Sequence, residues 1–404
     1  MSKSLLYHGF GIRGYEYRRT DFEDGCVMFS IQQPRESFRC SACGSRRLFS
    51  RGQVRREFRS LPIGGRPTYI RFAVPRVCCR DCGVVRQVKI GFADTRRSYS
   101  RAFERYALEL LRSMTIRDVA VHLGISWDVI KDIQKRHLQK HFSRPKLRHV
   151  RQIAIDEISI GKGHRYLTVV LDLQGGAVLF VGDGKGADAL KPFWKRLRCS
   201  GAKIEAVAID MSPAYLRAVG DHLPGAVVVF DHFHVIKLFN EKLSELRREL
   251  YREATDQLQQ QVLKGTRWLL LKNPENLDET RQEPKRLRDA LKLNEALSAA
   301  YYLKEDLGRL WNQPNKACAV THLDIWIMQA QWSGVRILMQ FAKTLAAYRT
   351  GILAWYDYPI STGPLEGTNN KIKMMKRQAY GFRDLEFFKL KILAIHKAKY
   401  ALVG

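Results

Sequence analysis

Long apolar runs are missing from this chain of 404 residues, although hydrophobic residues make up 45% of it. No stretch approaches the roughly 18 consecutive apolar residues that a membrane-spanning helix needs, which excludes an integral membrane protein. The first ten residues, MSKSLLYHGF, also lack the apolar core of a secretory signal. We therefore expect a cytoplasmic protein with no membrane partner.

Two kinds of catalytic motif are absent as well. The sequence contains no glycine-rich P-loop pattern, so ATP is not implied as a substrate. No serine or cysteine stands beside a suitable base, which argues against a hydrolase with a side-chain nucleophile.

Acidic residues are scarce relative to basic ones. The chain has 40 Asp plus Glu against 69 Lys plus Arg, a formal net charge of +29. Residues 1–150 hold 31 basic and 13 acidic residues, and residues 367–404 hold nine basic and two acidic residues. Solubility alone does not require such an imbalance. The charge predicts a polyanionic partner, and nucleic acid is the leading candidate.

Four of the eight cysteines form two Cys-x-x-Cys pairs, separated by 35 residues. Each pair can hold a metal ion from one tight turn, and two pairs complete a tetrahedral Zn²⁺ site. The segment between them is expected to form a hairpin of short strands that brings the pairs together. We predict a zinc ribbon within a domain of residues 1–95, with structural Zn²⁺ bound by Cys40, Cys43, Cys79 and Cys82. Disulfides are the alternative, and Cys78 is an alternative ligand to Cys79.

Residues 115–135 have the pattern of a helix-turn-helix. Apolar positions typical of two short packed helices lie on either side of Gly124, where the turn needs a left-handed residue. Ser126 is expected to cap the second helix. A small helical linker bundle is the alternative. For a DNA-binding domain of residues 96–148, the predicted DNA contacts are Arg117, Ser126, Trp127, Lys131 and Lys135.

The middle of the chain alternates between strands and helices. Residues 149–236 give the order β-β-β-α-β-α-β, which is typical of the first part of an RNase H-like domain. The expected strands ending at Asp156 and Asp210 place two carboxylates at one edge of the sheet. Residues 237–350 are almost wholly helical and too long for a connection, so we expect a helical insertion. Trp268 and Trp332 can stack on a flipped base, and packing in the core of the insertion is the favoured alternative for each.

Residues 351–404 are expected to complete the catalytic core with a basic C-terminal helix. Glu366 falls in the first turn of a predicted helix, and Asn370 follows on or near the same face. A carboxylate there can help to hold a divalent cation, and the alternative is an acid that only starts the helix and is stabilised by the helix dipole. Lys373, Lys376 and Arg377 of this helix can hold phosphates. The predicted fold is thus multidomain α+β: an N-terminal zinc ribbon and helix-turn-helix, then an RNase H-like α/β catalytic domain interrupted by an all-helical insertion.

Three carboxylates far apart in the sequence, Asp156, Asp210 and Glu366, can be gathered by this fold. Bare carboxylates suit Mg²⁺ or Mn²⁺, which prefer oxygen ligands. Two such ions can activate water or a 3′-hydroxyl and stabilise the leaving oxygen at phosphorus. The chemistry that fits is metal-dependent phosphodiester transfer on DNA.

With these residues in place, the chain resembles the DDE (Asp-Asp-Glu) transposases of bacterial insertion sequences, in the ISL-three family. The resemblance extends over nearly the whole chain, and its main motifs are AIDEISIGKGHRYLTVVLDL, AVAIDMSPAY, VVVFDHFHVIK and STGPLEGTNNKIKMMKRQAYGFRD. It implies that Asp156, Asp210 and Glu366 are the metal-binding catalytic triad. The family's usual Asn before the glycine is Thr362 here, which affects a local turn contact.

The step Asp231-x-x-His234 resembles an accessory signature of related transposases. By that resemblance, the two residues shape the active site or contact the scissile phosphate. The alternative is that both satisfy hydrogen bonds at the end of a strand.

The resemblance implies a transposase that binds the terminal inverted repeats of an insertion sequence and catalyses cleavage and strand transfer with two Mg²⁺ (or Mn²⁺) ions. Transposition needs both DNA ends in one complex, so a homodimer is expected on double-stranded terminal and target DNA. The expected location is the bacterial cytoplasm, at the nucleoid when DNA is bound. The alternative is a transposase-derived transcriptional regulator that binds specific DNA without cleaving it.

Overall fold

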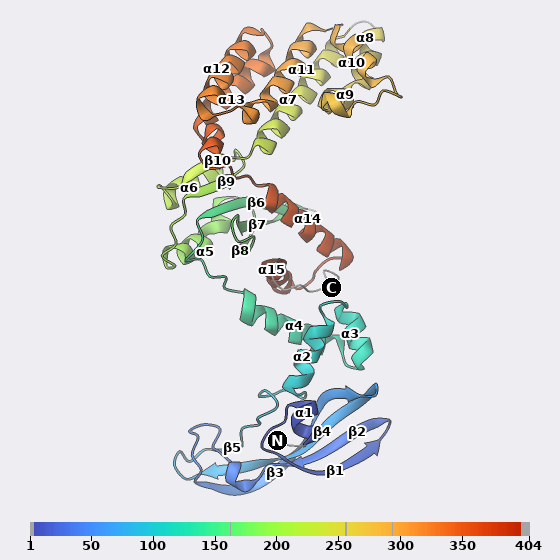
Figure 1. The fold of residues 1–404 in the computed structure, drawn as a ribbon, viewed down its shortest axis with the longest axis vertical. Helices are drawn as coiled ribbons and strands as arrows, with labels where there is room; N and C mark the ends of the chain where they lie inside the picture. Colours follow the sequence, from blue (N-terminus) through green and yellow to red (C-terminus); the bar gives the residue numbers. More distant parts are fainter. Residues whose placement is uncertain (1–3, 162, 255–256, 293, 397–404) are drawn as a thin grey trace. The chain divides into compact units, whose positions relative to one another are not determined.

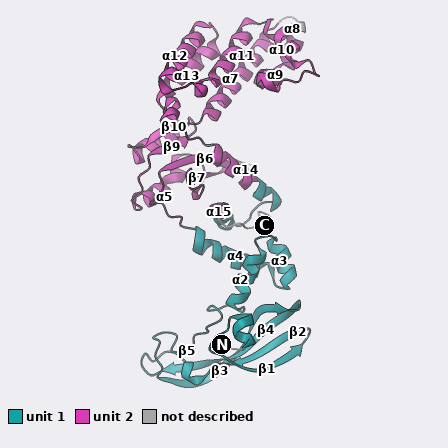
Figure 2. Ribbon diagram, in the orientation of Figure 1, with its two compact units in different colours: residues 1–143, 374–391, 398–404 teal, residues 144–373, 392–397 magenta. Residues whose placement is uncertain are grey.

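The computed structural model describes residues 4–161, 163–254, 257–292 and 294–396, and it divides into two compact units (Figures 1 and 2). Within these residues, unit 1 takes the chain up to Ser143 together with Met374–Lys391, and unit 2 takes Arg144–Lys373 and the residues from Ile392. The expected segment 351–404 is therefore divided between the units, and its residues 397–404 lie outside the described ranges. No helix in the described ranges is long and apolar enough to cross a membrane.

Unit 1 begins with a five-stranded sheet and a short helix (Figure 1). The predicted hairpin between the cysteine pairs is present, but its strands have 16 and 14 residues and are not short. Gly64 and Gly65 join them with positive φ angles of 53° and 78°. The elements are α1 (Leu5–Phe10), β1 (Glu16–Glu23), β2 (Cys26–Gln32), η1 (Arg35–Ser37), β3 (Leu48–Ile63), β4 (Arg66–Cys79) and β5 (Val85–Gln87), with sheet order β1-β2-β4-β3 and β5 beside β4.

The predicted helix-turn-helix is confirmed in the same unit. Thr115 caps the first of its helices, and Asp118 completes the capping box by accepting the N–H of Thr115. Gly124 ends that helix with φ 59°, the left-handed conformation expected at the turn. The helices of this region are α2 (Arg101–Leu110), α3 (Ile116–Leu123) and α4 (Trp127–Phe142).

Unit 2 is built on a second five-stranded sheet, with order β10-β9-β6-β7-β8. Strands β6, β7 and β8 are antiparallel neighbours, whereas β9 and β10 run parallel to β6. The chain order β-β-β-α-β-α-β confirms the predicted RNase H-like arrangement. Its elements are β6 (Gln152–Gly161), β7 (Arg165–Asp172), β8 (Val178–Asp183), α5 (Ala187–Arg198), β9 (Ala206–Ile209), α6 (Pro213–His222) and β10 (Val227–Phe230).

The predicted end of the first of these strands at Asp156 is wrong. Strand β6 continues to Gly161 because its antiparallel pairing with β7 extends beyond its parallel pairing with β9. Asp156 is paired with Val169 of β7 in the interior of the strand. Asp210 does follow the last residue of β9, as predicted.

The chain after β10 is helical, as the sequence predicts. Short turns at Pro274 and near Asn312 interrupt the series of helices. The prediction that Trp268 and Trp332 pack in the core is wrong, because they are 66% and 78% exposed. Residues Ala319, Leu323, Trp326 and Ala330 carry the buried stripe of α12, and Trp332 lies about 200° around the helix from Ala330. The elements are α7 (His232–Glu253), α8 (Gln257–Gly265), α9 (Arg267–Leu271), η2 (Pro274–Asn276), α10 (Glu283–Lys292), α11 (Glu295–Gly308), η3 (Leu310–Asn312), α12 (Lys316–Trp332), α13 (Arg336–Leu353) and η4 (Ala354–Tyr356).

The last two helices are α14 (Gly363–Gln378) and α15 (Leu385–Ala394), and the division between the units falls within each of them. Glu366 lies in the first turn of α14, where the sequence places it.

Candidate active site and metal centre

Three aspartates lie in one row across neighbouring strands of the unit 2 sheet. The parallel pairing of Ala154 with Ala208 puts Asp156 and Asp210 two residues further along their strands. Strand β10 pairs with β9 up to Phe230 and Ile209, so Asp231 follows at the same level. The strand register therefore places Asp210 and Asp231 beside Asp156, although they follow it by 54 and 75 positions in the sequence.

Asp156 is half-buried among these groups. Burial raises the pKa of its carboxyl group, the charge of Asp210 raises it further, and His234 acts in the opposite direction. Its Oδ2 accepts a hydrogen bond of 2.8 Å from Nδ2 of Asn369 in α14. Partial burial and a neighbouring carboxylate both oppose the ionised form of Asp156. A bound cation would stabilise that ionised form.

Glu366 is exposed, and it lies one turn before Asn369 on the same side of α14. The N–H of Glu366 donates to the carbonyl oxygen of Thr362 at 2.8 Å. In the described part of the chain, no three carboxylates or histidines are gathered closely enough to hold one ion. The structure thus places Asp156 and Asp210 beside each other, and it does not gather Asp156, Asp210 and Glu366 within reach of one ion.

Asp231 is 2% exposed, and both of its oxygens are occupied within the protein. Oδ1 accepts the N–H of Phe233 at 2.9 Å and caps α7, while Oδ2 accepts the N–H of Thr362 at 2.9 Å and its hydroxyl group. Asp231 thereby fixes the start of α7 and the turn before α14. Thr362 thus makes the turn contact with both its N–H and its own hydroxyl.

Asn369 is the residue that the sequence reasoning missed. It is 4% exposed, whereas its neighbour Asn370, which we expected near the Glu366 face, is exposed. The signal was present as two consecutive asparagines one turn after Glu366. Spacings of three and four residues both return to the same helix face, so the sequence alone does not choose between them. Glu157, next to Asp156, instead accepts a hydrogen bond of 2.7 Å from the hydroxyl of Tyr215.

The four predicted zinc ligands converge in unit 1, where the sulfurs of Cys40, Cys43, Cys79 and Cys82 all lie within 4.8 Å of one another. Sγ of Cys40 is 3.7 Å from that of Cys82, and Sγ of Cys43 is 3.5 Å from that of Cys79. A tetrahedral Zn²⁺ with bonds of about 2.3 Å separates its sulfurs by about 3.8 Å, so the cluster fits this ion.

The local backbone prepares one thiol of each pair for ionisation. The N–H groups of Cys43 and Ala42 lower the pKa of Cys40 to about 6, and the N–H of Cys82 lowers the pKa of Cys79. Gly44 and Gly83 have φ angles of 76° and 68° and close the two turns. Thiolates in such turns are the form of cysteine that binds a metal.

The predicted DNA-contacting residues fall into two groups. Ser126 starts α4 but makes no capping hydrogen bond with its side chain. Lys131 and Lys135 are half-buried, and each ammonium group lies 3.1 Å from Oδ2 of Asp384; Lys135 also lies 2.7 Å from Oε2 of Glu386. Those that are exposed are Arg117, Ser126, Trp127, Lys373 and Arg377, while Lys376 is half-buried.

Comparison with known families accounts for most of this architecture. Residues 153–392 match a family described as "Transposase", residues 88–138 match the helix-turn-helix domain of transposase family ISL3, and residues 36–82 match the zinc-finger of transposase IS204/IS1001/IS1096/IS1165. The three matches follow the order of the zinc ribbon, the helix-turn-helix and the RNase H-like region along the chain.

Individual relatives agree with the family matches. The transposase for insertion sequence element IS1001 of Bordetella parapertussis is 34% identical, with 98% of each chain covered. The transposase for insertion sequence element IS1557 of Mycobacterium tuberculosis is 28% identical over 92% of this chain and 89% of the relative. Among solved structures, the Drosophila P element transposase strand transfer complex has a TM-score of 0.37 and 11% identity, covering 73% of this chain and 92% of that one. The family matches and the IS1001 relative support an enzyme and give no support to a regulator without cleavage activity, and they show that the chain belongs to the ISL3 family of DDE transposases.

Proposed function

We propose that this transposase cleaves and joins DNA with Asp156, Asp210 and Glu366 as its divalent metal ligands. The observation that carries the proposal is that Asp156 and Asp210 lie beside each other on neighbouring strands. Burial and the charge of Asp210 both raise the pKa of Asp156. A cation at this position would offset both effects. Glu366 is proposed as the third ligand because it lies one turn before Asn369 on α14, and Asn369 donates a hydrogen bond to Asp156.

Magnesium is the proposed ion, with two ions per active site, because carboxylate oxygens are the ligands that Mg²⁺ and Mn²⁺ prefer. When bound, such ions supply a polarised nucleophile and charge stabilisation for in-line attack at phosphorus. Asn369 would orient the Asp156 carboxylate through its hydrogen bond. Asp231 would act as a positioning residue, since both of its oxygens already hold the protein together.

His234 lies close enough to Asp156 to lower the pKa of that carboxyl group. We propose that it contacts the scissile phosphate, where an imidazole can donate a hydrogen bond to a phosphate oxygen. Lys373, Lys376 and Arg377 follow Glu366 along α14 and would bind phosphates next to the cleaved one.

The zinc ribbon and helix-turn-helix are proposed to recognise the terminal inverted repeats, with Zn²⁺ bound by Cys40, Cys43, Cys79 and Cys82. Arg117, Ser126 and Trp127 would contact DNA from exposed positions at the start of α3 and α4. We propose a homodimer on DNA, because both ends of the element have to meet in one complex. Its place of action would be the bacterial nucleoid in the cytoplasm.

The test is cleavage of terminal-repeat DNA by the purified full chain with and without Mg²⁺. We expect Asp156→Asn, Asp210→Asn and Glu366→Gln each to abolish cleavage while DNA binding is retained. Glu157→Gln is the matched control, because this carboxylate adjoins Asp156 but bonds Tyr215. Full cleavage by any of the three triad variants would refute the assignment of that residue, and wild-type binding without metal-dependent cleavage would favour the regulator.

A further inference from the structure

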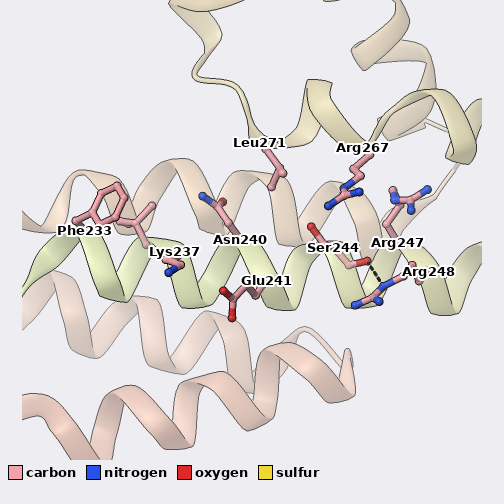
Figure 3. Close-up of a pocket in the computed structure, with 10 residues that line it drawn as sticks. Phe233, Lys237, Asn240, Glu241, Ser244, Arg247, Arg248, Arg267 and Leu271 are labelled. Carbon is pink, nitrogen blue, oxygen red and sulfur yellow. Dashed lines mark hydrogen bonds between the residues drawn. The ribbon is translucent and has the colours of Figure 1, made fainter. Parts of the chain in front are cut away.

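A groove of about 420 Å³ runs between α7 and α9 in the helical region of unit 2 (Figure 3). It begins at Phe233, two residues after Asp231, and follows one side of α7 as far as Arg248. The 15 residue-to-residue steps from Phe233 to Arg248 correspond to about 22 Å of helix. The groove thus starts next to the row of aspartates and leads away from it along the helix.

Positive charge dominates the walls of this groove. Lys237, Arg247, Arg248 and Arg267 line it, with Glu241 as the acidic residue among the lining side chains. None of the four cations forms an ion pair with a carboxylate in the described residues. The polar contacts of Arg247 and Arg248 go to backbone carbonyl oxygens, those of Leu263 and Ser244 respectively.

Two other cations that lie on or against α7 are neutralised. Lys242 pairs with Glu245 at 2.8 Å, and Arg336 of α13 pairs with Glu249 at 2.8 Å. The four cations of the groove differ from these two in having no carboxylate partner among the described residues. An excess of this kind indicates a site for an anion.

In the described part of the chain, the side chain of Arg247 lacks a hydrogen-bond acceptor for one of its buried nitrogen atoms. Burial lowers the pKa of its guanidinium, and the charges of Arg267 and Arg248 lower it further. Its Nε is buried and has no hydrogen-bond partner among the described residues. A phosphate oxygen would accept from this group and offset the repulsion among the three arginines.

Exposed aromatic rings accompany the cations. Phe233 is 48% exposed, and Trp268, which adjoins Arg267 in α9, is 66% exposed. The guanidinium carbon of Arg267 lies 4.9 Å from the centre of the Trp268 ring. Aromatic faces beside a cationic groove are the arrangement that binds nucleic acid strands whose bases are unpaired.

We infer that this groove binds a DNA strand with unpaired bases next to the cleavage site. Arg247, Arg248 and Arg267 hold its phosphates, and Phe233 and Trp268 stack on its bases. The inference rests on the proposed function, because the groove leads from the aspartates proposed to act at the cleaved phosphate. It gives the helical insertion a role in holding the strand during the reaction.

The test uses the full chain and terminal-repeat DNA that carries an unpaired single-stranded flank. Arg248→Gln/Arg267→Gln removes two exposed cations of the groove, and Lys242→Gln/Arg336→Gln removes two ion-paired cations as the matched control. Losing two single-strand phosphate contacts should reduce the slope of log K against log salt by about 1.4, with no change for the control. Trp268→Ala should weaken binding of the flanked DNA about tenfold and leave binding of fully paired DNA unchanged.

An unchanged salt slope in Arg248→Gln/Arg267→Gln, in a preparation whose wild type cleaves, would overturn the groove assignment and leave the proposed function standing. A wild type that does not cleave end DNA would instead contradict the proposed function. Tight binding of a nucleoside triphosphate without DNA, lost in the groove variant, would identify a small phosphate ligand and also overturn the inference.

Discussion

The side-chain amide of Asn369 donates a 2.8 Å hydrogen bond to Oδ2 of Asp156, and so joins α14 to the central strand of the unit 2 sheet. Asn369 is 4% exposed, and its Oδ1 has no partner in the described residues. The bond fixes the orientation of one proposed metal ligand from the helix that carries another, Glu366. Groups that orient a metal ligand in this way strongly affect metal affinity.

Replacing Asn369 with alanine should therefore reduce metal-dependent DNA cleavage about 10- to 100-fold and raise the Mg²⁺ concentration needed for half-maximal rate. The exposed neighbour Asn370 gives the control, Asn370→Ala, which should cleave normally. Cleavage rates over a Mg²⁺ titration provide the measurement. Equal Mg²⁺ requirements in both variants would show that the hydrogen bond does not orient the ligand.

The ion pairs of Asp384 predict a second effect, on DNA affinity. Burial alone would raise the pKa of Asp384, but the N–H of Phe387 and the ammonium groups of Lys131 and Lys135 hold it at about 2. Its negative charge therefore competes with DNA for two cations of α4 at neutral pH. Asp384→Asn should strengthen DNA binding about two- to tenfold, an effect that fades at high salt.

Binding isotherms at several salt concentrations test this prediction. Asp94→Asn is the control, because Asp94 pairs with Arg101 at 2.7 Å and touches neither lysine. If Asp384→Asn binds DNA no better than Asp94→Asn, Lys131 and Lys135 do not contact DNA.

Zinc content distinguishes Cys79 from Cys78. Cys79 Sγ lies 3.5 Å from Cys43 Sγ, whereas Cys78 is half-buried and outside the four-cysteine cluster. We expect one Zn²⁺ per wild-type chain by elemental analysis, retention of it in Cys78→Ser, and loss in Cys79→Ser with a lower unfolding temperature. Loss of zinc from Cys78→Ser with retention in Cys79→Ser would reverse the assignment.

The buried ammonium group of Lys391 predicts a dependence of stability on pH. Lys391 is 6% exposed and has no hydrogen-bond partner among the described residues, and burial lowers its pKa from 10.5 to about 8. Between these pH values the unfolded chain keeps the proton and the folded chain does not. The contribution of Lys391 to stability therefore becomes more favourable as the pH rises from about 8 to 10.5.

Lys391→Met should remove this rise and increase the free energy of unfolding at pH 7 by about 1–3 kcal/mol. Chemical denaturation of both proteins at pH 7 and pH 10 measures it, with Lys140→Met, at an exposed lysine of α4, as the control. A difference between wild type and Lys391→Met that is the same at both pH values would contradict the prediction.

Local sequence patterns predicted much of the fold. The Cys-x-x-Cys turns and the turn at Gly124 each depend on residues within a few positions of one another. The alternation of strands and helices in residues 149–236 likewise predicted the RNase H-like order. The patterns failed where a distant partner sets the end of an element. The strand that contains Asp156 continues to Gly161 because it pairs with β7.

The sequence by itself determined which modules this transposase has and which residue types it brings to chemistry, because spacing along the chain sets turns, helix faces and strand periods. Only the tertiary structure decided which of these residues meet. In the structure Asn369, and not Asn370, donates a hydrogen bond to Asp156. Lys135 contacts Asp384, 249 residues away, and Trp268 is exposed beside the arginines of the groove. Such contacts depend on strand register and helix rotation, which distant packing fixes and short-range sequence spacing does not.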